Sequence, residues 1–256
     1  MLLAIDVGNT QTVIGVYEGA RLAHSWRIAT VKGQTADEMR TSLRMLFMAD
    51  GFEPSNVEGA VLSSVVPRLT GAWERALERM LGCRVLVCSA QAAGELFPTF
   101  YANPAEVGAD RVADFIGARM LYGAPCVVVD FGTATNIELV DADGRFAGGI
   151  IAPGVETSAN ALFSLASKLT NTALVAPDQP LGQSTDQAVR AGIVLGEADR
   201  VDGLVERIFA QVGYRAPVVA TGGLASVIAP HSRVITEVNP ELTLEGLRAL
   251  YEWKMQ

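Results

Sequence analysis

A run of apolar residues, a polar turn and a second apolar run open the chain, and this pattern returns in the second half. The first copy covers residues 2–16 and the second covers residues 126–140. In both copies the first run ends in Asp, one apolar residue and Gly, and small hydroxyl or amide residues follow. Two apolar runs around a tight turn predict a β-hairpin. Because hairpin and turn are repeated together, we predict a duplicated domain and one site built from two facing turns.

Strands and helices alternate after the first hairpin. Thr35 and Glu38 form the pattern of a capping box, and apolar residues at helical spacing continue to a stop at Gly51. A second helical stripe follows Pro67 and ends at Gly82. The predicted order over the first half is three strands, a helix, a strand, a helix and a strand. After the hairpin, the predicted strands are residues 21–28, 57–66 and 84–87.

The stretch 97–111 has no clear period and contains two prolines and three aromatic residues. It predicts an ordered loop that leads into a helix from about Gly108 through Tyr122. Asp110 and Arg111 then lie in the first turn of this helix, where an acidic residue is also favoured by the helix dipole alone. The position of Asp110 by itself is therefore compatible with a structural role and with a functional one.

The second half continues the alternation from about residue 123. Beyond the second hairpin we expect a strand, a helix, a long helix capped at Ser184, two more strands and a closing helix. The strand at 218–223 ends in two glycines, which suits either a flat ligand such as adenine or a plain strand–helix turn. We therefore predict two domains, residues 1–122 and 123–256. Since no flexible linker separates them, we expect them to pack closely with a cleft between them.

The composition of the two repeated turns suits a polyphosphate. Gly lets the backbone approach a bulky anion or adopt positive φ, and the amide groups of a turn can converge on that anion. Hydroxyl groups can donate to phosphate oxygens, whereas the carboxylates of Asp6 and Asp130 suit a cation such as hydrated Mg²⁺. One such turn alone is more often an ordinary hairpin turn, but the collinear repeat favours a nucleotide site. The hydroxyls concerned belong to Thr10, Thr12, Thr133 and Thr135.

The composition of the chain disfavours several classes of protein. Of 256 residues, 50% are hydrophobic and 19% are charged, and the net charge of −8 disfavours nucleic-acid binding. No apolar run is long enough for a membrane helix and no signal peptide opens the chain, so we expect a cytoplasmic protein without a membrane partner. The three cysteines are too scattered for a structural zinc site and are expected to be small buried residues, and neither histidine lies in a motif. These residues are Cys83, Cys88, Cys126, His24 and His231.

The motifs together resemble the type III pantothenate kinases of bacteria, which are members of the actin-like ATPase superfamily. The resemblance covers nearly the whole chain. The first hairpin marks only the superfamily, whereas the Gly-x-Asp-Arg element at 108–111 is more specific. The matching segments are residues 6–10, 63–67, 101 with 103–104, 108–111, 130–135, 148–154, 221–223 and 239–247.

The resemblance implies an α/β fold of two duplicated RNase H-like (actin-like ATPase) domains, each a mixed β-sheet flanked by helices, with a cleft between them. It implies transfer of the γ-phosphoryl group of ATP to the primary hydroxyl of pantothenate. The product is 4'-phosphopantothenate, in the first step of coenzyme A synthesis. Mg²⁺ and a monovalent cation, K⁺ or NH₄⁺, are the implied cofactors. The implied working form is a cytoplasmic homodimer.

The resemblance also implies roles for individual residues. Asp110 is the implied general base, Asp6 the holder of Mg²⁺ through water, and Asp130 the holder of the monovalent cation. The implied ATP-binding residues are Asp6, Val7, Gly8, Asn9, Thr10, Gln11, Thr12, Val13 and Thr133. The implied pantothenate-binding residues are Tyr101, Gly108, Ala109, Asp110, Arg111 and Thr185. Thr185 is expected to act in a substrate site that is shared across the dimer.

Two other functions are compatible with the same fold. A kinase of the superfamily with another acceptor would share the phosphate turns but not the 101–111 element. A non-catalytic regulator would not need the three carboxylates at Asp6, Asp110 and Asp130, and the pI near 4.9 does not favour DNA. The sequence also departs from the family pattern. Val112 replaces an aromatic residue, Asn136 replaces Thr or Ser, and residues 165–174 lack a basic-proline pattern.

Overall fold

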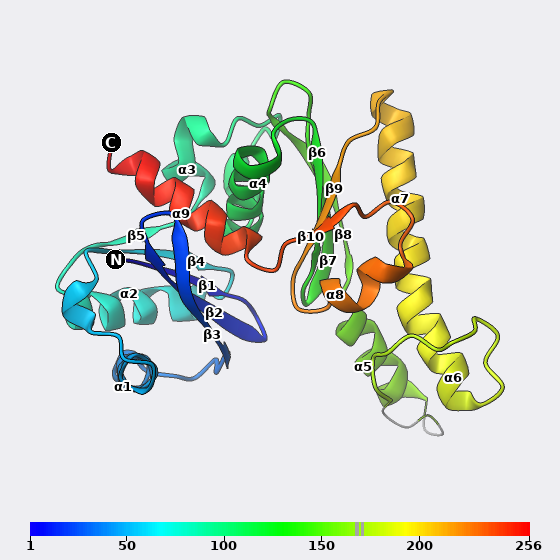
Figure 1. Cartoon of the computed structure of the whole chain (residues 1–256), viewed down its shortest axis with the longest axis horizontal. Coiled ribbons are helices and arrows are strands. Elements are labelled where there is room, and N and C mark those ends of the chain that lie inside the picture. The colour runs from blue at the N-terminus through cyan, green and yellow to red at the C-terminus, as the bar shows by residue number, and fades with distance from the viewer. Residues whose placement is uncertain (167–168, 170–171) are drawn as a thin grey trace. The chain divides into compact units, whose positions relative to one another are not determined.

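The chain forms two compact α/β units in the computed structural model, which describes residues 1–166, 169 and 172–256 (Figure 1). The first unit comprises Met1–Met120 with Leu242–Gln256, and the second comprises Leu121–Glu241. Each unit contains one mixed five-stranded sheet with helices packed against it. In the described part of the chain, no helix combines the length and the apolar character needed to span a membrane.

The sheet of the first unit has the strand order β3-β2-β1-β4-β5. The first three strands pair antiparallel, and β4 and β5 extend the sheet from β1 in parallel. The central strands β1 and β4 are largely buried along their length, as expected for strands that are covered on both faces. The strands are β1 (Leu2–Val7), β2 (Gln11–Glu18), β3 (Arg21–Ala29), β4 (Gly59–Ser64) and β5 (Val85–Val87).

The helices of the first unit begin and end largely as the sequence predicts. At the start of α1, Thr35 Oγ1 accepts from Glu38 N, and the Glu38 carboxylate accepts from Thr35 N, which confirms the capping box. α2 ends at Gly82 in the left-handed conformation. The apolar stripes of α1 and α2 form one core with the sheet. The helices are α1 (Ala36–Ala49), α2 (Pro67–Leu81), α3 (Ala90–Ala93), α4 (Ala109–Tyr122) and α9 (Leu242–Lys254).

The second unit repeats this topology with the strand order β10-β9-β6-β7-β8. β6, β7 and β8 pair antiparallel like β1, β2 and β3, and β9 and β10 extend the sheet in parallel like β4 and β5. Asp6 pairs with Ser63 on the parallel neighbour strand, and Asp130 pairs with Thr221 in the same way. The structure therefore carries the duplication that the repeated hairpin predicts. The strands are β6 (Cys126–Phe131), β7 (Ala134–Val140), β8 (Phe146–Pro153), β9 (Val218–Thr221) and β10 (Glu237–Val238).

The long helix predicted after Ser184 is interrupted. Ser184 caps it as expected, with its Oγ accepting from Gln187 N at 3.2 Å. A π-helical turn, with one glycine inside it and another directly after it, then joins α6 to α7. Glycine has a low helix propensity, which favours this departure from the α-helix. Apolar residues of this turn and of α7 form the core of the second unit with β6, β7 and β9. The helical elements are α5 (Val155–Leu165), α6 (Thr185–Arg190), the π-helical turn (Ala191–Leu195), α7 (Gly196–Val212) and α8 (Ala225–Ile228).

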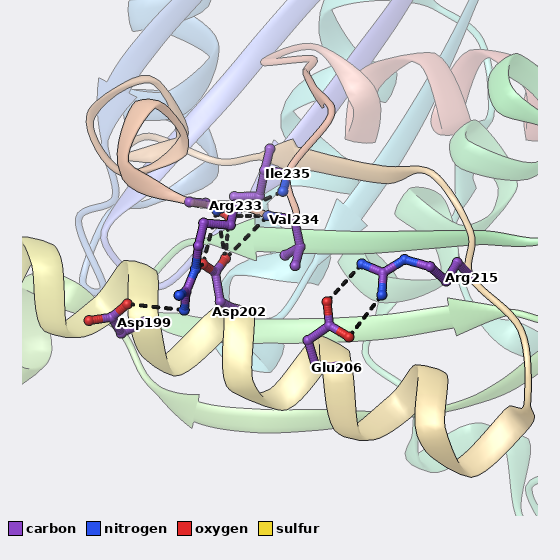
Figure 2. A network of polar contacts seen from close by, with 8 residues as sticks. Asp199, Asp202, Glu206, Arg215, Arg233, Val234 and Ile235 are labelled. Carbon is purple, nitrogen blue, oxygen red and sulfur yellow. Dashed lines mark hydrogen bonds and ion pairs between the residues drawn. The ribbon is translucent and has the colours of Figure 1, made fainter.

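A buried carboxylate on α7 fixes the segment that leads to β10 (Figure 2). Asp202 accepts hydrogen bonds from Ser232 Oγ at 2.5 Å, Arg233 N at 2.9 Å and Val234 N at 3.4 Å. Burial opposes its ionisation, but these hydrogen bonds and the one from the Arg233 guanidinium prevail and lower its pKa. The exposed Asp199 approaches the same guanidinium only at 3.5 Å.

We expect Asp202→Ala to lower the free energy of unfolding by about 3 kcal/mol, because one buried donor and several part-buried donors lose their acceptor. In the wild type this stabilisation is present above the carboxyl's unfolded pKa near 4 and is lost as the pH falls below it. Denaturant unfolding of both proteins at pH 7 and pH 3 would measure it. Asp199→Ala is the matched control and should change stability little. Equal effects of the two substitutions would contradict this assignment.

The closing helix α9 belongs to the first unit, whereas the sequence places it with the second half. Its side chains cover the sheet face opposite α1 and α2, where Leu244 lies against Gly15 of β2. α9 also crosses α4 at very short range. A Cβ on Gly246 would lie 1.8 Å from Ala113 O, and a Cβ on Gly117 would lie 2.6 Å from Leu242 O. Glycine on both helices thus allows the backbones to touch.

We expect Gly246→Ala to destabilise the protein by about 3 kcal/mol or more, because the added methyl meets a carbonyl that belongs to a packed helix backbone. Thermal unfolding would measure the loss. Gly203→Ala on α7 is a matched control, since a Cβ there meets nothing within 4 Å. It should raise stability slightly through helix propensity. A harmless Gly246→Ala would show that the crossing is looser than described.

Candidate functional site

Asp6 lies on the central strand of the first unit, on the face opposite the core formed with α1 and α2. Ile5 and Val7 are members of that core, so the alternation of a strand directs Asp6 to the other face. Its Oδ1 is shielded from solvent and makes no hydrogen bond among the described residues. A buried carboxylate oxygen without a partner is costly, which marks this position as a place for a ligand.

The surroundings of Asp6 raise its pKa to about 7. Burial is the largest cause and the nearby carboxylate of Asp110 adds to it, whereas the Ser63 hydroxyl and the Arg27 guanidinium act in the opposite direction. The Ser63 hydroxyl acts by hydrogen bonding to the carboxylate, but the contact lacks the distance and angle of a well-formed hydrogen bond in the described residues. A cation bound here would displace the proton and meet a full negative charge.

Asp110 lies in the first turn of α4, as predicted. Its Oδ1 accepts a hydrogen bond from Arg111 N at 2.7 Å. Burial raises the pKa of Asp110, although this hydrogen bond and the Arg111 charge lower it in part. Gly108 leaves the room that the carboxylate occupies, because a Cβ there would lie 2.6 Å from Asp110 Oδ1. The structure thus brings two half-buried carboxyl groups, Asp6 and Asp110, near one another.

A thiol supports the start of α4. Cys88, which directly follows β5, donates from Sγ to Ala109 O at 3.4 Å. Burial and the carboxylates nearby raise its pKa, so the thiol stays protonated and able to donate. Cys88 and Cys126 are buried as the composition predicts, whereas Cys83 is only partly buried.

The turn between β1 and β2 is exposed at its tip. Asn9, Thr10 and Gln11 are exposed, and Gly8 N donates to Gln11 O at 3.0 Å. A Cβ on Gly8 would lie 2.9 Å from that oxygen, so glycine serves close approach here and not a positive φ. Arg27 Nη1 donates to Gln11 Oε1 at 3.0 Å. Arg27, to which the sequence analysis gave no role, therefore places a positive charge beside the turn.

The four predicted turn hydroxyls divide into two kinds. Thr10 and Thr133 are exposed at the tips. Thr12 is buried with its Oγ1 2.9 Å from Thr30 Oγ1, and the buried Thr135 donates from Oγ1 to a carboxylate of α7 at 2.7 Å. Their hydrogen-bonding capacity is used inside the units. Thr10 and Thr133 are the two of these threonines that are exposed to solvent.

Asp130 occupies the equivalent position in the second unit. Its sheet neighbours Asn136 and Thr221 are both buried and polar. Gly222, with a φ of +88°, follows β9 directly, and a Cβ there would lie 2.4 Å from Asp130 Oδ1. The first glycine of the pair after β9 therefore makes room for this carboxylate. The oxygen-rich surroundings suit a hard cation.

The residues expected to bind pantothenate come from different elements. Tyr101 is half-buried in the loop before α4, and Arg111 is buried within that helix. Thr185 is exposed at the start of α6 in the second unit. It lines a pocket of about 670 Å³ together with apolar residues of α5 and the ion pair of Glu197 and Arg200. In the departing segment 165–174, residues 167, 168, 170 and 171 lie outside the described residues.

Strand register reveals a residue to which the sequence gave no role. Ser63 stands in one of the matching segments, but its place beside Asp6 follows only from the parallel pairing of β1 and β4. Asp6 and Asp110 both lie in the first unit, whereas Asp130, Thr133 and Thr185 lie in the second. The facing of the two turns stays a prediction.

The first unit suits a divalent cation only if the protein supplies few of the ligands. Among the described residues, no three His, Cys, Asp or Glu side chains gather as metal ligands. Mg²⁺ usually keeps several waters and binds through one or two carboxylates and the phosphates of a substrate. The unpartnered Oδ1 of Asp6 fits that mode, in which the nucleotide brings most of the remaining oxygens.

Comparison with known proteins identifies the family. A family model described as type III pantothenate kinase matches residues 2–207. The chain belongs to this family. Type III pantothenate kinase of Roseiflexus sp. strain RS-1 is 44% identical over 252 residues, which is 98% of each chain. The type III pantothenate kinase described here is thus a transferase of coenzyme A biosynthesis that acts on ATP and pantothenate.

Solved structures share the fold of this pantothenate kinase at low sequence identity. A conserved putative Baf family transcriptional activator from Campylobacter jejuni matches with a TM-score of 0.61 and 17% identity, over 99% of this chain and 98% of that one. Component A of (R)-2-hydroxyglutaryl-CoA dehydratase from Acidaminococcus fermentans matches with a TM-score of 0.58 and 18% identity, over 99% and 98%. These likenesses concern the fold, which is that of the actin-like ATPases.

Proposed function

We propose that Asp110 is the general base of this pantothenate kinase. The primary hydroxyl oxygen of pantothenate forms a bond to the γ-phosphorus of ATP, the bond from that phosphorus to the bridging oxygen of ADP breaks, and Asp110 accepts the hydroxyl proton. The observation that supports this role is the pair of half-buried carboxyl groups at Asp6 and Asp110, one beside the first turn and one at a helix start. Burial raises the pKa of Asp110 above its ordinary value, which makes this carboxylate a stronger base.

The nucleotide end of the site is assigned to the two turns. Residues 6–13 and Thr133 hold the phosphates of ATP through backbone amides and the hydroxyls of Thr10 and Thr133. Asp6 holds Mg²⁺ through water, and Asp130 holds the monovalent cation, K⁺ or NH₄⁺. When bound, the cations neutralise charge that develops on the phosphoryl group. The exposed tips of both turns and the unpartnered Oδ1 of Asp6 support this assignment.

The substrate end is assigned to Tyr101, the 108–111 element and Thr185. The Arg111 charge lies beside the Asp110 carboxylate and offsets negative charge near the reacting oxygen. Gly108 supports the element by leaving room for the Asp110 carboxylate. Thr185 reaches the substrate from the partner subunit of a homodimer.

A homodimer is supported by exposed apolar side chains on α5. Leu165 is 87% exposed, and Leu162, three residues earlier on the same helix face, lines the pocket with Thr185. We expect Leu165→Glu to convert the dimer to a monomer, because the interface would have to bury a charge. Sedimentation velocity would measure the mass. Met48→Glu on α1 of the first unit, also exposed, is the matched control and should stay dimeric.

A coupled assay of ADP release with ATP and pantothenate tests the proposed function. We expect turnover that rises strongly on addition of K⁺ or NH₄⁺ and needs Mg²⁺. Sugars and carboxylates as acceptors should give no ADP above the ATPase background. Turnover with one of those acceptors but not with pantothenate would favour another kinase of the superfamily. No turnover with any acceptor would favour a regulator.

A further inference from the structure

Ser63 is a second unpartnered oxygen beside Asp6. It lies near the end of β4, fully buried, and pairs with Asp6 in the parallel register of β1 and β4. Paired residues on neighbouring strands direct their side chains to the same face. The Ser63 hydroxyl lies close enough to Asp6 to lower the pKa of that carboxyl, but among the described residues neither Ser63 Oγ nor Asp6 Oδ1 makes a hydrogen bond of good distance and angle. The two buried oxygens thus have at most each other, whereas buried polar atoms normally have well-formed partners.

The adjacent Ser64, by contrast, has a hydroxyl with well-formed hydrogen bonds. Ser64 Oγ donates to Val66 O at 3.3 Å, accepts from Val66 N at 3.2 Å and accepts from Thr70 Oγ1 at 3.0 Å. These contacts hold the start of α2. The Ser63 hydroxyl has none of this structural use in the described chain, although the two residues are consecutive.

The internal repeat places a hydroxyl at the same position in the second unit. Asp130 on β6 pairs with Thr221 on β9 just as Asp6 pairs with Ser63, and Thr221 is likewise buried. Each half of the molecule therefore sets a carboxylate and a hydroxyl side by side on its two central parallel strands. A core strand position filled by a polar residue in both copies points to a shared use of the pair.

We propose that Ser63 is a positioning residue for the divalent cation that accompanies ATP. Its hydroxyl and the Asp6 carboxylate hold and orient water of the hydrated cation, Asp6 as an acceptor and Ser63 as a donor or acceptor. This rests on the proposed placement of Mg²⁺ at Asp6. A hydrated cation matches the pair, because Mg²⁺ retains water and its outer partners fix that water.

Mn²⁺ binding to the complex of the enzyme with a non-hydrolysable ATP analogue tests the role of Ser63. Electron paramagnetic resonance of free Mn²⁺ gives the affinity without any turnover. We expect Ser63→Ala to weaken Mn²⁺ binding about tenfold, as the loss of an outer partner of a metal typically does. Ser63→Thr keeps a hydroxyl of the kind that the second unit carries at Thr221 and should bind Mn²⁺ like the wild type.

Ser64→Ala is the matched control. It should lower the melting temperature, since it removes the contacts at α2, and leave Mn²⁺ affinity unchanged. Ser63→Ala should keep or raise the melting temperature of the ligand-free enzyme, because it removes an unsatisfied buried group.

Unchanged Mn²⁺ affinity in Ser63→Ala would overturn the proposal. Turnover of the wild type with pantothenate is measured separately, so failure of the proposed function would appear there and not in the Mn²⁺ comparison.

Discussion

Asp110→Asn should lower kcat about 10²–10⁴-fold while the fold is retained. The amide keeps the size of the side chain and its hydrogen bond to Arg111 N, but it cannot accept the proton of the attacking hydroxyl. Because the base acts in the chemical step, we expect kcat to fall far more than KM rises. The coupled ADP assay over a range of pantothenate concentrations would measure both.

Asp114→Asn is the matched control for Asp110. Asp114 is buried one turn further along α4 and accepts from Thr243 Oγ1 at 2.6 Å, a contact that ties α4 to α9. Its substitution should cost stability and leave turnover near that of the wild type. Turnover near that of the wild type in a folded Asp110→Asn protein would remove the general-base assignment.

Asp6→Asn should abolish most of the phosphoryl transfer and remove a pH dependence of stability. The pKa of Asp6 is about 7 in the folded protein, against an ordinary value near 3.8, because burial and the Asp110 charge favour the neutral form. Between these values the native state holds a proton that the unfolded state has released. The free energy of unfolding of the cation-free enzyme therefore falls as the pH rises from about 4 to about 7, by up to about 4 kcal/mol from this group.

Denaturant unfolding of wild type and Asp6→Asn at pH 5 and pH 8, with chelator present, would measure this dependence. The variant should lose less stability between the two pH values than the wild type. Asp110 retains its own raised pKa, so part of the dependence stays in the variant. Identical slopes for the two proteins would show that Asp6 is ionised in the free enzyme already at low pH.

Local signals in the sequence predicted much of the fold. The Thr35–Glu38 capping box and the glycine after α2 lie where the pattern places them, because such signals act within one turn of chain. The repeated hairpin predicted two sheets of one topology, since a strand pair joined by a tight turn is a local structure. The same repeat drew attention to Asp6 and Asp130, and the 108–111 element drew attention to Asp110.

Features that depend on long-range packing could not be predicted from local sequence signals. α9 carries an apolar stripe that could cover either sheet, and only tertiary packing assigns it to the first. Ser63 lies beside Asp6 because β4 pairs with β1 across 50 intervening residues or more, which no local pattern specifies. The internal bonding of Thr12 and Thr135 follows from the hairpin face each occupies, which the turn sequence alone leaves open.

Because α9 packs on the first unit, the two units can complete their folds at different times during translation. The first unit is made from both ends of the described chain, and the second unit is inserted within it. On the ribosome, the sheet of the first unit is therefore synthesised before the second unit, but the sheet face that carries Asp6 stays uncovered until α9 has emerged. The second unit is contiguous and can complete its core sooner. Until α9 emerges, the nascent chain carries an unfinished apolar surface on the sheet of the first unit.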